Sequence, residues 1–315
     1  MQTLIDIVLR AGHSAVDVAL YTLLPIMVAM MILMRLLEVH GALEKLIQYL
    51  APVARPFGLT GLGILAMIQI SFVSSFAPLP TLALMEGKGA TNRHLAATFA
   101  SVLAMANANA AFPLSAIGVQ LGVVLGLSVV GGFVAAATTY WLFGRRLSNA
   151  RHATITISAI PASDKSLLKI ISTSGAEAIQ VTINIIPMLL LSLTVVLVLQ
   201  ETGAVDRMIC LMDPLLIYLG VNSAIILPTI TKYLAGSTAL VGLLVEMHKQ
   251  GQLPVTLLHH YSGFLIHPLD LVGVTVLATA GPRVAKVCLP AMAGASVGVA
   301  VRSIGTGLLA PYIGV

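Results

Sequence analysis

Charged residues are scarce in this chain of 315 residues, because only 9% are Asp, Glu, Lys or Arg whereas 58% are hydrophobic. That balance leaves too little polar surface to cover a soluble globule, so it excludes a soluble domain. Cysteine is also rare. Cys210 and Cys288 lie far apart in sequence without metal-ligand spacing, so they indicate two buried free thiols rather than a metal site.

Signatures of covalent chemistry are missing as well. The sequence has no Walker or dinucleotide-binding fingerprint and no Ser/His/Asp arrangement suited to hydrolysis. His267 and Asp270 alone supply too few ligands for a metal centre. We therefore expect a protein that is not an enzyme, with no metal and no organic cofactor. The net charge of +5 comes from loops and requires no nucleic-acid partner.

Long apolar stretches are the main positive feature of the sequence. Six of them approach or exceed the ~20 residues that a helix needs to cross ~30 Å of hydrocarbon. Helix is expected because open strand edges cannot be satisfied in lipid. The sequence therefore predicts an all-α polytopic membrane protein in contact with the lipid bilayer. Residues 1–17 carry charges between short apolar runs and predict an interfacial amphipathic helix. The six stretches are 18–39, 95–117, 119–144, 179–200, 256–279 and 287–312.

The chain contains an internal repeat. Residues 25–132, moved forward by 162 positions, align with 187–294 without a gap, and Ser75 falls on Ser237. Such repeats are typical of transporters whose site lies where the halves meet. The predicted organisation is the amphipathic helix followed by a first membrane repeat (18–144), a cytoplasmic linker (145–177) and a second membrane repeat (178–315).

One apolar segment in each repeat is interrupted near its middle. Residues 60–87 contain two prolines after Ser74-Ser75, and residues 222–249 contain a Gly-Ser-Thr interruption, so neither favours an unbroken helix. If each is a re-entrant helical hairpin, a repeat makes three crossings. An odd number of crossings inverts the second repeat relative to the first.

The positions of basic residues support this inversion. Under the inverted model, four segments share one side of the membrane and hold eleven of the seventeen Lys and Arg residues. By the positive-inside rule that side is cytoplasmic. We therefore predict a cell inner membrane protein with both termini outside the cytoplasm. The four segments are 40–57, 86–94, 145–169 and 281–287.

Several motifs resemble a known family. Residues 74–80 (Ser-Ser-Phe-Ala-Pro-Leu-Pro) resemble the first hairpin of concentrative nucleoside transporters and of the related nucleoside-recognition, or Gate, membrane proteins. Residues 231–236 resemble the second hairpin, and 262–264 (Ser-Gly-Phe) the start of the next helix. The resemblance implies a secondary transporter of a small-molecule solute, coupled to Na⁺ or H⁺, with its site between two hairpins at the bilayer midplane. It also implies a homo-oligomer.

The sequence departs from the family at both hairpins. Where the nucleoside transporters have a Gln-Thr-Glu sequence that binds the nucleobase, this chain has Ser74-Ser75-Phe76. Where they have an Asn-Glu pair that binds the ribose, it has Thr231-Lys232. A nucleoside or related metabolite is therefore only the first hypothesis for the solute. The alternative is a non-transporting scaffold or partner protein with the Gate fold, similar to sporulation-associated membrane proteins.

Ionisable residues inside predicted crossings are the sharpest candidates. A charge at the bilayer centre costs at least ~2.5–3.5 kcal/mol, so it normally faces a protein interior or a watery cavity. Once the Lys and Arg residues in predicted loops are set aside, three basic residues remain in the predicted membrane segments: Arg35, Lys232 and Arg302. Lys232 either binds an anionic or carbonyl-bearing solute or forms an ion pair with Asp270, and both can hold. His267, three residues earlier on the same helical face, either relays a proton or bonds a neighbouring carbonyl.

Neutral polar residues complete the candidate site. Asn107 and Asn109 either form interhelical hydrogen bonds or bind solute or Na⁺ where Pro113 ends regular helix. The residues predicted to bind substrate are Ser74, Ser75, Asn107, Asn109, Thr231, Lys232, Ser237 and Thr238. The residues predicted to couple an ion or proton are His267 and Asp270.

Overall fold

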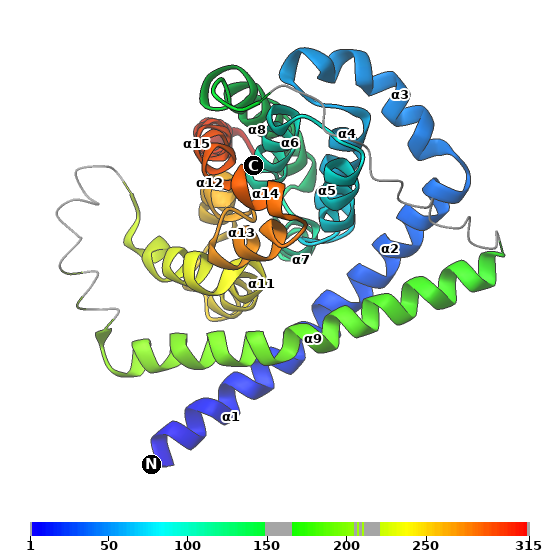
Figure 1. Cartoon of the computed structure of the whole chain (residues 1–315). Helices are drawn as coiled ribbons and strands as arrows, with labels where there is room; N and C mark the ends of the chain where they lie inside the picture. Colours follow the sequence, from blue (N-terminus) through cyan, green and yellow to red (C-terminus); the bar gives the residue numbers. More distant parts are fainter. Residues whose placement is uncertain (1, 149–165, 205–206, 208–209, 211–220, 314–315) are drawn as a thin grey trace.

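The computed structural model describes residues 2–148, 166–204, 207, 210 and 221–313. Within these residues every regular element is a helix, which confirms the predicted all-α class (Figure 1). In chain order the elements are α1 (Gln2–Asp17), the π-helical stretch η1 (Val18–Leu23), α2 (Leu24–Val39), α3 (Ala42–Ala54), the 3-10 turn η2 (Arg55–Phe57), α4 (Gly61–Phe72), α5 (Pro78–Gly87), α6 (Asn92–Ala104), α7 (Ala108–Ala116), α8 (Leu121–Thr138), the π-helical stretch η3 (Thr139–Phe143), α9 (Leu167–Glu201), the 3-10 turn η4 (Ser223–Ile225), α11 (Ile226–Lys249), α12 (Val255–Leu265), α13 (Leu271–Ala278), α14 (Pro282–Lys286) and α15 (Cys288–Ile313).

Two long helical rods cross beside a compact bundle of the other helices (Figure 1). The first rod runs from α1 through η1 into α2, and the residues flanking η1 keep helical backbone angles. It packs across α9, where buried Ala11, Ala15 and Ala19 let the two helices approach closely. Residues 2–17 are therefore helical, but they continue into α2. Their interfacial placement stays a prediction. The predicted boundary between 177 and 178 lies inside continuous α9.

Helices α4 and α5 form the first hairpin, as the interruption in 60–87 predicts. Pro78 begins α5. The first N–H of a helix has no intrahelical acceptor, so the N–H that proline lacks costs no hydrogen bond here. The turn between the helices is closed by a hydrogen bond from the Ala77 N–H to Ser74 Oγ (3.1 Å). The Thr81 hydroxyl donates to Gln69 Oε1 (2.7 Å) and joins the two arms.

Helix α11 is divided into two arms at Gly236, whose φ of 85° and ψ of 178° lie outside the helical region. The first arm starts beside the middle of α12, because the Asn222 N–H donates to Tyr261 Oη (2.9 Å). The second arm starts at the far end of α12, where Ser237 Oγ donates to the His267 carbonyl (2.9 Å). It then returns to the turn that leads into α12. The arms are therefore antiparallel, as the predicted second hairpin requires.

Two crossings that the sequence predicts as single helices are broken. The predicted helix 95–117 is interrupted at residues 105–107, between α6 and α7. The chain leaves the helix at Met105 and becomes helical again in α7, so Pro113 lies inside α7. The prediction that Pro113 ends regular helix is therefore wrong. The predicted helix 256–279 is interrupted at residues 266–270. Pro268 disfavours helix in the residue before it, and the Asp270 carboxylate caps the restarted helix α13.

Helix α15 packs on α6, α8 and α12. Glycines permit this close approach: a Cβ on Gly298 would meet the carbonyl oxygen of Gly131 and the Cβ of Ala104. The close packing brings α15 beside the broken ends of both α6 and α12.

The described residues contain four helical segments long and apolar enough to cross a membrane. A fifth candidate is the pair Lys45–Phe57 and Gly61–Phe72, which bends by 105°. The chain is thus a multi-pass membrane protein with four to five candidate spans. The four segments are Asn92–Ala116, Leu121–Phe143, Ser223–Lys249 and Cys288–Tyr312. Three coincide with predicted crossings, and the remaining one is the α11 hairpin divided at Gly236.

Candidate functional site

The two helix breaks meet at the side chain of Arg302. Arg302 Nη1 donates a hydrogen bond to the Ala104 carbonyl at the end of α6. Nη2 donates to the Ile266 carbonyl at the end of α12 (2.9 Å). Positions 104 and 266 are equivalent in the internal repeat. The guanidinium is buried, so one cation from α15 serves the same carbonyl in both halves.

Lys232 and Asp270 form the ion pair that the sequence predicts. Lys232 Nζ donates to Asp270 Oδ2 and to Ser237 Oγ (3.1 Å). Asp270 Oδ1 accepts from the Gly273 N–H (2.7 Å) at the start of α13. The pair is buried and joins the first arm of α11 to the break between α12 and α13. Its contact is confirmed, and its role remains a prediction.

His267 lies in the bend between α12 and α13 rather than on a helix, so the expected shared helical face with Asp270 is wrong. The ring is fully buried, and its Nδ1 accepts from the Leu269 N–H (3.1 Å). This bond places the proton of a neutral ring on Nε2. Nε2 has no hydrogen-bond partner among the described residues. His267 therefore presents one unused polar atom close to the ion pair.

Four further predicted residues are buried with polar atoms that lack a hydrogen-bond partner in the described part of the chain. Both amide atoms of Asn107 and of Asn109 are unpartnered, at the start of α7. The hydroxyls of Ser75, in the first hairpin turn, and of Thr231, beside Lys232, are also unpartnered. Buried polar groups almost always have partners, so such a set indicates contact with a solute, an ion or water.

The remaining predicted residues serve the local backbone or the ion pair. Ser74 Oγ accepts from Ala77 and shapes the hairpin turn. Ser237 lies between Lys232 and the His267 carbonyl. Thr238 is half-buried in the second arm of α11.

Arg302 is the residue whose role sequence reasoning missed. The sequence marked it as a membrane-embedded arginine but did not indicate what it contacts. Its partners are main-chain carbonyls, and a side chain that binds main chain leaves no complementary residue type to look for. The one sequence signal related to this contact is the repeat register, which makes positions 104 and 266 equivalent.

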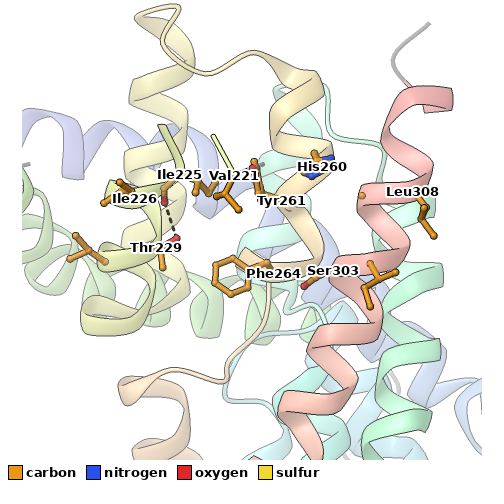
Figure 2. A pocket seen from close by; sticks show the side chains of 12 residues that line it. Val221, Ile225, Ile226, Thr229, His260, Tyr261, Phe264, Ser303 and Leu308 are labelled. Carbon is orange, nitrogen blue, oxygen red and sulfur yellow. Dashed lines mark hydrogen bonds between the residues drawn. The ribbon is translucent and has the colours of Figure 1, made fainter. Parts of the chain in front are cut away.

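Two cavities lie near these residues. The first, of about 410 Å³, has Asp270, Tyr233 and Ser296 in its wall, so the ion pair adjoins open space. The second, of about 640 Å³, lies between the first arm of α11, α12 and α15 (Figure 2). Its wall is mainly apolar, and the Thr229 hydroxyl in it donates to the Ile225 carbonyl of its own helix (2.8 Å). The polar candidate site is therefore distinct from the larger, apolar cavity.

The described residues contain no group of three or more His, Cys, Asp or Glu side chains arranged to hold a metal ion. Both cysteines are free thiols, but Cys210 is exposed and Cys288 is only half-buried, so the prediction that both are buried is wrong.

Helical hairpins paired with broken helices define the class of this protein as an all-helical, multi-pass membrane protein of transporter-like fold. The family model for Gate, described as nucleoside recognition, matches residues 20–163. Residues 20–163 therefore match a Gate nucleoside-recognition domain, and the resemblance predicted from the first-hairpin motif is confirmed. The match covers the predicted first repeat from residue 20 onward and part of the predicted linker that follows it.

Solved structures extend the similarity to the whole fold. The chain is similar to an inward-facing, substrate-bound state of CNTnw, a concentrative nucleoside transporter, with 17% identity and a TM-score of 0.66, covering 100% of this chain and 85% of that one. It is similar to a variant of CNTnw in an outward-facing state, with 18% identity and a TM-score of 0.68, covering 92% and 76%. An intermediate state of CNTnw gives 18% identity, a TM-score of 0.70 and coverage of 93% and 76%. No curated protein matches the sequence.

Proposed function

We propose that this protein is a secondary transporter of a small polar solute, with a nucleoside or related metabolite as the first candidate, driven by a Na⁺ or H⁺ gradient. The observation that carries the proposal is the set of buried, unpartnered polar atoms of Ser75, Asn107, Asn109, Thr231 and His267, in the hairpins and helix breaks. The binding of a substrate by CNTnw, whose fold is similar, supports a small-molecule solute.

The proposed architecture is two inverted repeats in an inner membrane, each with a re-entrant hairpin. Its support is that each half contains two antiparallel helical arms followed by a broken helix. The two breaks share Arg302 through repeat-equivalent carbonyls, Ala104 and Ile266. Cytoplasmic placement of the basic loops, external termini and homo-oligomerisation belong to this proposal as predictions.

One observation favours a second candidate function, a non-transporting membrane scaffold or partner protein. The Lys232–Asp270 pair is closed and buried, so it has little need of a ligand. A scaffold would use the pair only to hold the second hairpin against α13. The unpartnered polar atoms favour transport over this alternative, because they offer a polar solute hydrogen-bonding groups that no protein group occupies.

A ligand screen by thermal shift tests the proposal. Purified protein is heated with nucleosides, nucleobases, amino acids and small carboxylates, each in Na⁺ or K⁺ buffer and at two pH values. A solute at ~100 times its dissociation constant should add ~2.7 kcal/mol of stability. Asn107→Ala is expected to abolish the shift without lowering the melting temperature of the free protein, because the amide makes no hydrogen bond to lose.

Ser115→Ala is the matched control on the same helix, because the Ser115 hydroxyl is satisfied by the Phe112 carbonyl (2.7 Å). This variant should retain the ligand shift. A solute found in this way is then assayed for uptake into liposomes. No shift with any solute, together with a destabilised Asn107→Ala, would instead support the scaffold.

A further inference from the structure

Two helix C-termini point at one place in the protein interior. Helix α6 ends at Ala104 and α12 ends at Leu265. The last carbonyls of a helix lack intrahelical donors, and each C-terminus carries the equivalent of about half a negative charge. Two converging C-termini therefore create a site with about one negative charge, away from water. Such a site favours a cation.

Arg302 fills this position. Its Nη1 and Nη2 each donate to one of the two helix ends, at Ala104 and Ile266. A planar guanidinium suits this task because its fork presents donors in two directions at once, whereas an ammonium is a point charge. Arg302 is also among the largest fully buried side chains in the described part of the chain.

The surrounding helices are built to admit this side chain. A Cβ on Gly131 of α8 would collide with Arg302 Cγ and Cδ. A Cβ on Gly263 of α12 would collide with the Arg302 main chain. Glycine at both positions thus leaves room for the arginine stem and for its helix. Each half of the chain supplies one acceptor carbonyl, whereas only the second half supplies the cation.

We propose that Arg302 is a tethered cation that permanently occupies the cation position between the two helix breaks and sets their separation. Arg302 is then a positioning residue for the candidate site, because Asn107 and His267 follow Ala104 and Ile266 along their breaks. The protein accordingly requires no Na⁺ at this junction. The consequence for ion coupling rests on the proposed transport function, whereas the positioning role does not.

Chemical rescue tests the proposal on the purified full-length protein. Arg302→Ala is expected to lower the thermal unfolding midpoint by roughly 5–10 °C. Guanidinium at low millimolar concentration should restore part of this loss in a saturable way, because it replaces the missing group between the two carbonyls. Na⁺ and choline should restore less. The wild-type midpoint should not respond to guanidinium in this range, because the position is already filled, and any rise with Na⁺ from a coupling site elsewhere should be equal in wild type and variant.

Arg10→Ala is the matched control, because Arg10 is an exposed arginine that pairs with Glu201 (2.6 Å). Its midpoint should not respond to guanidinium. If Arg302→Ala does not fold, Arg302→Lys tests the same point: the charge is kept but the fork is lost, so its midpoint should lie below wild type and rise with guanidinium.

Three results would overturn the proposal. They are a wild-type midpoint that rises saturably with guanidinium, an Arg302→Ala variant as stable as wild type, and destabilised Arg302 variants that guanidinium does not rescue. Failure to detect solute binding or uptake would contradict the transport function and would leave this stability experiment unaffected.

Discussion

Lys232→Met is expected to destabilise the protein by about 3–5 kcal/mol, because it leaves the Asp270 carboxylate buried without its partner. The side chains of Lys232 and Asp270 are 0% and 2% exposed, so water cannot replace the lost ammonium. The effect should reach beyond the pair, since Asp270 also caps α13 through the Gly273 N–H. Thermal or denaturant unfolding of the purified protein measures the loss.

The double variant Lys232→Met with Asp270→Asn should recover most of that stability. Asn keeps an oxygen able to cap α13 but removes the charge that would be left unpaired. The recovery, measured as a double-mutant cycle, distinguishes a true pair from two independent residues. Strictly additive effects of the two substitutions would show that the pair contributes nothing.

Lys249→Met is the matched control for this cycle. Lys249 Nζ lies 3.3 Å from Asp17 Oδ2, and both side chains are more than half exposed. Exposed pairs contribute little to stability because solvent screens them. Lys249→Met should therefore unfold close to wild type.

Gly298→Ala should cost about 1–3 kcal/mol through overpacking. The added methyl would lie 2.8 Å from the Ala135 Cβ and 3.0 Å from the Ala104 Cβ, and would also collide with the Gly131 carbonyl oxygen. Relief requires α15 to move away from α6 and α8. Because Gly298 lies one turn before Arg302, the same movement should weaken the bond from Arg302 to the Ala104 carbonyl.

Gly126→Ala on α8 is the control for this substitution. A Cβ on Gly126 has no neighbour within 4 Å, so the methyl meets open space. Alanine is also the better helix former, so Gly126→Ala should be neutral or slightly stabilising. Equal unfolding midpoints for the two variants would argue against close packing of α15.

The hairpins could be predicted because their signals are local. Pro78 and Pro80 follow a Ser-Ser pair in one, and Gly236 precedes Ser237 in the other, and each of these residue types acts on its own backbone. The Lys232–Asp270 pair could be predicted for a different reason. Buried charges need partners, and Asp270 is the one acid in the middle of a predicted crossing.

The break between α6 and α7 could not be predicted from the same kind of signal. Residues 105–107 (Met-Ala-Asn) continue an apolar composition, and the visible helix breaker, Pro113, lies inside α7. Hydropathy measures which residues prefer lipid, and it is insensitive to whether the backbone stays helical. The break after α12 does carry a local signal, Pro268, but a proline can kink a helix as well as end it. The expected shared face of His267 and Asp270 assumed a kinked helix where the chain is in fact broken.

The sequence by itself determined that the chain is a helical membrane protein, that it is internally repeated and that each half contains an interrupted hairpin segment, because composition, periodicity and proline act through short-range physics. Only the tertiary structure decided where α6 and α12 break and that both ends converge on Arg302. A carbonyl at position 104 or 266 has no residue-type signature. It becomes an acceptor for a buried cation only when packing against α15 brings the two helix ends together.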